Sequence, residues 1–107
     1  MATNIPRGSV RGIEILEVTL SPATVATTTS AEQTFTVQGL RLHDFVWVNK
    51  PTTQAGLCIV GARVSAADTL AITFANVTSG TLTPTGSQVY TVFRCSPSDL
   101  PVPSAIA

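Results

Sequence analysis

The chain has 107 residues, no net formal charge and only 11% charged residues, against roughly 25% in a typical soluble domain. This length fits one domain that can fold without a metal or disulfide. One lysine and five scattered arginines disfavour nucleic-acid binding, which depends on clustered basic side chains. Low charge with 44% hydrophobic residues favours a surface covered by a partner over a neutral soluble monomer.

The sequence shows neither a secretory signal nor a membrane-spanning segment. The opening residues, MATNIPRGSVRGIE, lack the apolar core of a signal peptide. No apolar run approaches the roughly 18 residues that a spanning helix needs. We therefore expect synthesis and function without secretion, and no membrane partner.

The first elements are an extended arm and a strand. Residues Met1–Gly12 carry proline and glycine and are expected to form the arm, and Ile13–Leu20 has the composition of a strand. Apolar residues occupy positions 13 and 15 and then 16, 18 and 20. That one-residue change of phase predicts a β-bulge.

The next stretch is threonine-rich and weaker in pattern. Residues Ala23–Thr29 are β-prone, Ser30–Gln33 reads as a polar turn, and Thr34–Val37 alternates as a strand with Phe35 and Val37 inward. A short strand is expected at Leu40–Leu42. Phe45–Val48 is apolar at every position, which predicts a central strand with Trp47 in the core.

The clearest signal is a hairpin. Leu57–Ser65 and Thr69–Val77 flank the turn Ala66-Ala67-Asp68, with Leu70, Ile72 and Phe74 sharing one face. The loop Thr78–Gly86 follows. The last strand, Gln88–Cys95, places Tyr90, Val92 and Arg94 on one face and residues 89, 91, 93 and 95 on the other.

Short strands at intervals of about ten residues predict an all-β fold, a single small antiparallel β-sandwich or barrel with Greek-key or jelly-roll-like connections. The domain is expected over residues 13–95, between an N-terminal arm at 1–12 and an extended C-terminal arm at 96–107. The C-terminal arm is rich in proline and cannot be helical. It is either solvated or docked on a neighbouring subunit.

Reactive groups are few, and we expect no enzymatic activity, cofactor, metal or small-molecule substrate. His43-Asp44 is the one adjacent pair of His and carboxylate, but neighbours in a strand point to opposite faces. Glu14 and Glu17 also fall on opposite faces unless the bulge reunites them. The phosphate-binding glycine motifs are absent.

Three further features have ordinary structural interpretations. Asn76-Val77-Thr78 matches the N-glycosylation pattern, which is incidental without secretion. Trp47 and Tyr90 could stack on a sugar, although core packing is the preferred reading for Trp47. Cys58 and Cys95 are expected to be buried thiols, with a disulfide as the alternative, and a single histidine argues against zinc.

The stretch Gly39–Arg94 resembles small virion proteins encoded beside the capsid gene in tailed bacteriophages. The resemblance lies in the order VNKPT, QAGL, ARVSAADTLAITFAN and a closing PT-x₄-YTV strand. It implies a non-enzymatic capsid decoration, or cement, protein on the outer surface of the virion head. Its implied partners are the major capsid protein and copies of itself, as a dimer or trimer.

Two rival readings remain, a tail or fibre module that contacts host glycans and a head–tail connector component. Decoration predicts hundreds of copies bound to preformed capsids. A receptor module predicts few copies and glycan binding, and a connector predicts a ring.

Contact with the shell is expected at the two arms. The candidate residues are Ile5, Pro6 and Arg7 at one end and Leu100, Pro101 and Val102 at the other. Arg41, Lys50 and Arg63 are candidates for polar anchoring, with solvated surface charge as the alternative.

Overall fold

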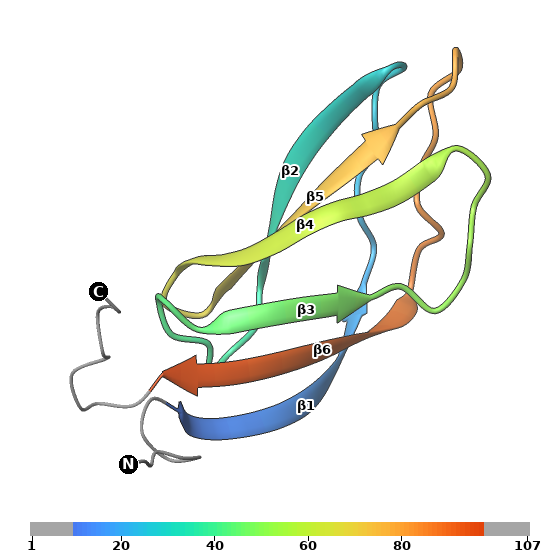
Figure 1. The fold of residues 1–107 in the computed structure, drawn as a ribbon. Helices are drawn as coiled ribbons and strands as arrows, with labels where there is room; N and C mark the ends of the chain where they lie inside the picture. The colour runs from blue at the N-terminus through green and yellow to red at the C-terminus, as the bar shows by residue number, and fades with distance from the viewer. Residues whose placement is uncertain (1–9, 98–107) are drawn as a thin grey trace, which may run out of the picture.

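The protein folds into two three-stranded antiparallel sheets, and no helix occurs among residues 10–97, which a computed structural model describes (Figure 1). Side chains are described for residues 12–96. One sheet has the order β1-β6-β3 and the other β2-β5-β4. The all-β prediction is confirmed, and both sheets are open, which excludes a closed barrel.

The strand bounds extend several predicted elements. The strands are β1 (Val10–Leu20), β2 (Thr29–Thr36), β3 (Phe45–Asn49), β4 (Leu57–Ala66), β5 (Thr69–Asn76) and β6 (Gln88–Pro97). Strands β1 and β6 thus continue a few residues into the segments predicted as arms. The remaining parts of those segments, 1–9 and 98–107, lie outside the described residues.

The apolar core draws on both sheets. Tyr90 and Val92 of β6 are fully buried in the same cluster as Leu70 and Phe74 of β5. The β4–β5 hairpin has the predicted face assignment, and so does β6, whose even-numbered residues 90 and 92 face inward. Asp68 at the hairpin turn has a φ of 58°, a left-handed conformation that Asp tolerates better than most residues.

The bulge predicted within Ile13–Leu20 is wrong. These residues pair with β6 in unbroken register, and the irregularity lies earlier, between Val10 and Gly12. The change of phase has another cause. Leu16 and Val18 pack against the core, whereas Ile13 and Ile15 are exposed on the opposite face, so the strand is apolar on both sides.

Two local predictions in the middle of the chain are also wrong. Ser30–Gln33 is not a turn but the centre of β2, because every residue from Thr29 to Thr36 has a partner on β5. Leu40–Leu42 forms no strand. Leu40 is nevertheless buried, and its carbonyl accepts a hydrogen bond from the backbone N–H of Asp68 at 2.9 Å.

The prediction that Phe45–Val48 is a central strand with Trp47 in the core is wrong. Strand β3 lies at the edge of its sheet, not in the centre. Val46 and Val48 are buried, but Phe45 is 60% and Trp47 69% exposed. Trp47 is therefore not a core residue, and the second apolar face of this strand points to solvent.

Candidate interaction surface

The outward side of the β1-β6-β3 sheet is a continuous apolar surface. The strand register aligns Ile13, Cys95 and Phe45 in one row and Ile15, Phe93 and Trp47 in the next. Four of these side chains are at least 60% exposed. We call these six residues the outer apolar face.

A polar row borders the outer apolar face. Glu17, Thr91 and Asn49 align next to the row of Ile15, Phe93 and Trp47. Among the described side chains, those of residues 12–96, Glu17 is the only charged one in these rows. Such an apolar surface with a polar border is typical of a protein–protein contact.

The other sheet has a different outward side. Ser30, Glu32 and Thr34 of β2 point outward there, and Arg63 of β4 joins them. Arg63 donates from Nε to Glu32 Oε2 at 2.7 Å and from Nη2 to Oε1 at 3.0 Å. The Arg63 hydrogen bonds hold the pKa of Glu32 below its usual value. The two sheets therefore present unlike surfaces, one apolar and one polar.

A groove lies where the edges of the two sheets meet. Strands β3 and β4 lie side by side without pairing (Figure 1). The groove has a volume of about 310 Å³ and is lined by Val46, Trp47, Val48, Ile59, Val60, Gly61 and Ala62. Its lining side chains are aliphatic or aromatic, while polar atoms supply a comparable share of the exposed lining.

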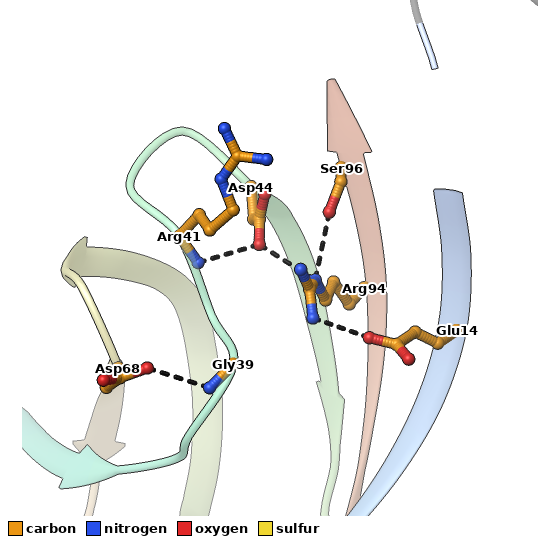
Figure 2. A network of polar contacts seen from close by, with 7 residues as sticks. All are labelled: Glu14, Gly39, Arg41, Asp44, Asp68, Arg94 and Ser96. Carbon is orange, nitrogen blue, oxygen red and sulfur yellow. Dashed lines mark hydrogen bonds and ion pairs between the residues drawn. The ribbon is translucent and has the colours of Figure 1, made fainter. Parts of the chain in front are cut away.

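Arg94 forms a polar network at one end of the β1-β6-β3 sheet (Figure 2). Its Nε lies 2.9 Å from Asp44 Oδ2 and donates to Ser96 Oγ at 3.0 Å, and its Nη1 donates to Glu14 Oε1 at 2.6 Å. Asp44 Oδ2 also accepts the backbone N–H of Arg41. The network joins β1, β6 and the turn before β3.

This network gives Asp44 a structural partner other than His43. The Asp44 side chain is 1% exposed and faces Arg94, whereas His43 is exposed in a turn with a φ of 80°. Glu14 pairs with Arg94, while Glu17 points to the opposite face of the regular strand. Glu14 and Glu17 therefore do not converge on one site, whereas Glu14 and Asp44 both contact Arg94.

The remaining candidates from the sequence are dispersed. Tyr90 is buried while Trp47 is exposed on the opposite face of the sheet, so they form no common sugar platform. Lys50 donates to the carbonyl oxygen of Thr52 at 2.9 Å, and burial lowers its pKa. The three basic candidates have different partners, since Arg63 pairs with Glu32 and the backbone N–H of Arg41 donates to Asp44.

The cysteine prediction is confirmed in part, because the thiols are free as expected but are not fully buried. Both thiols are free, Cys58 is exposed and Cys95 is half-buried within the outer apolar face. Neither is therefore a fully buried thiol, and the disulfide alternative is excluded as well.

The contact residues predicted in the arms, Ile5, Pro6, Arg7, Leu100, Pro101 and Val102, lie outside the described residues. Sequence reasoning missed the outer apolar face. The sequence does indicate this face, because β1 and β3 have apolar residues on both sides. In β1 that pattern was interpreted as a bulge, and in β3 it was interpreted as a central strand.

Within residues 10–97, no group of three or more His, Cys, Asp or Glu side chains could hold a metal ion. The described part of the chain also has no helix that is long and apolar enough to cross a membrane. No protein-family model, curated protein or solved structure matches this chain.

Proposed function

We propose that this protein is a non-enzymatic structural component that coats a protein shell, as a capsid decoration protein of a tailed bacteriophage does. The supporting observation is the outer apolar face, which is directed away from the core and needs a protein cover. In this proposal the two sheets form a small β-sandwich that carries the binding face on one side. The phage assignment rests on the resemblance of Gly39–Arg94.

The unlike surfaces of the two sheets support a coat protein. The apolar side would be buried against the shell and against neighbouring copies. The side with the Arg63–Glu32 pair would remain in water. A neutral chain can pack beside like copies without strong repulsion, and many weak contacts repeated over a shell give durable binding.

A co-sedimentation assay tests this function. Purified protein is mixed with expanded heads of the encoding phage that lack it, and bound copies are counted after centrifugation. We expect saturable binding in the hundreds of copies. The proposal fails if the wild-type protein does not bind these heads.

Two variants locate the contact. Ile15→Ser should weaken head binding about tenfold or more, because burying a large aliphatic side chain contributes about 1.5–3 kcal/mol. Val77→Ser is the matched control, since Val77 is 71% exposed but follows β5, away from the outer apolar face. Equal binding by both variants would move the contact elsewhere.

A further inference from the structure

Strand β1 is an edge strand that pairs on one side only. All its register partners lie on β6. Among residues 10–97, no backbone hydrogen bond joins Ile13–Leu20 to a segment other than β6. The other side of β1 therefore presents a row of backbone N–H and C=O groups, which can pair with another strand.

The other three sheet edges have neighbours within the described part of the chain. Strands β3 and β4 lie side by side, so their edges face each other (Figure 1). At β2, the side chain of Gln33 donates to the carbonyl oxygen of Ala23 at 2.9 Å and accepts the N–H of Ala23 at 2.8 Å. The segment before β2 is thus held against that strand, and β1 is the edge that the described residues leave open.

Strand β1 also lacks the features that keep natural edge strands from pairing, which include lysine, proline and bulges. Ile13–Leu20 contains neither lysine nor proline. Its register with β6 is unbroken, because the irregularity lies earlier, between Val10 and Gly12. Of its two acidic residues, Glu14 is already paired with Arg94. A long, regular edge with apolar residues on both faces is a site for strand addition.

A second copy of β1 fits this edge, and charge selects the register. A two-fold axis perpendicular to the sheet opposes residues of the same face, so odd positions meet odd positions. An axis at Glu14 or Glu17 would place two glutamates directly opposite each other, which destabilises a strand pair. An axis at Leu16 would make the two Glu17 side chains diagonal neighbours, and Glu17 has no ion-pair partner among the described side chains.

An axis at Ile15 avoids these contacts. Ile15 then meets Ile15 of the second copy, and Ile13 meets Glu17. The two Glu17 residues are separated by roughly 13 Å along the strands, which exceeds the screening length of about 8–10 Å at physiological salt. The two Glu14 side chains become diagonal neighbours, but each is paired with its own Arg94.

We propose that two copies of this chain form a dimer by antiparallel pairing of β1 with β1 around Ile15. The β1-β6-β3 sheets of the two copies then form one six-stranded sheet, a usual size for a sheet. The neutral chain adds no net repulsion between copies. Both outer apolar faces lie on the same side of this sheet, which doubles the surface offered to a shell. The pairing itself needs no shell.

A disulfide placed at the axis tests the register. Opposed residues of an antiparallel pair have Cα atoms about 4.5 or 5.5 Å apart, which a disulfide can span. The thiols of Ile15→Cys would therefore meet, whereas those of Ile13→Cys would lie roughly 13 Å apart along the strands. Ile13 is the matched control, because it is 63% exposed against 68% for Ile15 and lies on the same face.

Both variants are made in a parent chain with Cys58→Ser and Cys95→Ser, so that only the introduced thiol reacts. Circular dichroism checks the fold, and sedimentation velocity checks that the parent keeps the wild-type oligomeric state. Non-reducing gels then measure linked dimer after mild oxidation at micromolar protein. We expect Ile15→Cys to link at least about tenfold faster than Ile13→Cys, since pairing gives the thiols at the axis a millimolar effective concentration.

Sedimentation velocity of the wild-type chain without heads should show a dimer that dissociates on dilution. A chain that is monomeric at every concentration would overturn the proposal, and so would equal linking of the two variants. A dimer in which neither variant links would place the contact outside β1 and overturn the proposal as well. Head binding is measured separately, so either proposal can fail alone.

Discussion

Arg94 holds one end of a sheet together through partners from distant parts of the chain. Its side chain is 12% exposed and that of Asp44 is 1% exposed, so water screens this ion pair weakly. The exposed Arg63–Glu32 pair is the natural comparison. Both are arginine–carboxylate pairs, but one is buried and the other is exposed, so their loss should change the free energy of unfolding by very different amounts.

Asp44→Ala should lower the free energy of unfolding by about 1–3 kcal/mol, because it removes the buried one of the two carboxylate partners of Arg94 and leaves only Glu14, whose side chain is half exposed. Glu32→Ala should leave the urea midpoint almost unchanged. Urea titrations followed by circular dichroism measure both. A similar loss in the two variants would show that burial does not distinguish these pairs.

Tyr90 has a fully buried ring, and its hydroxyl lacks a hydrogen-bond partner among the described residues. Burial raises the pKa of Tyr90, so the folded state favours the neutral phenol. Between the unfolded pKa near 10 and the higher folded pKa, the unfolded chain binds fewer protons. Stability should therefore be complete below about pH 10 and fall above it.

Tyr90→Phe should remove this alkaline loss. The variant should also gain up to about 1 kcal/mol at neutral pH, because no hydrogen bond is given up for the buried hydroxyl. Urea titrations between pH 7 and 11 test both expectations. A marked loss of stability at neutral pH would show that the hydroxyl has a partner after all.

Two glycines in and beside the β4–β5 hairpin are expected to respond oppositely to alanine. Gly56 precedes β4 with a φ of 80°, and a Cβ there would collide with the side chain of Thr78. Gly61 lies within β4 in open space and outside the left-handed region. The first glycine is required by the backbone and the second is not.

Gly56→Ala should destabilise the protein by about 1–3 kcal/mol through strain. Gly61→Ala should stabilise it by about 0.4–1 kcal/mol through the lower entropy of the unfolded chain. Thermal unfolding measures both. Destabilisation by Gly61→Ala would indicate a tighter fit of β4 than its surroundings suggest.

Predictability from sequence differed between elements for physical reasons. The hairpin of β4 and β5 was found because its alternation and turn residues agree. Strand β2 was partly missed because Ser30–Gln33 has polar residues at three of four positions, and its pairing with β5 is a long-range contact. Local propensity cannot detect such pairing.

At the scale of the whole molecule, the all-β class was predictable and the outer apolar face was not. Short alternating segments indicated the class. Trp47 was placed in the core because an apolar side chain buried in the core and one exposed on the outer face of a sheet look alike in sequence. Only the position of β3 at a sheet edge separates the two cases.

The two free thiols have a practical consequence. Cys95 belongs to the outer apolar face, whereas Cys58 is exposed on the other sheet. A partner that covers one side of the molecule would shield one sulfur from an alkylating reagent and leave the other accessible. The wild-type chain thus carries a separate chemical label on each face, which mass spectrometry can read without any engineered residue.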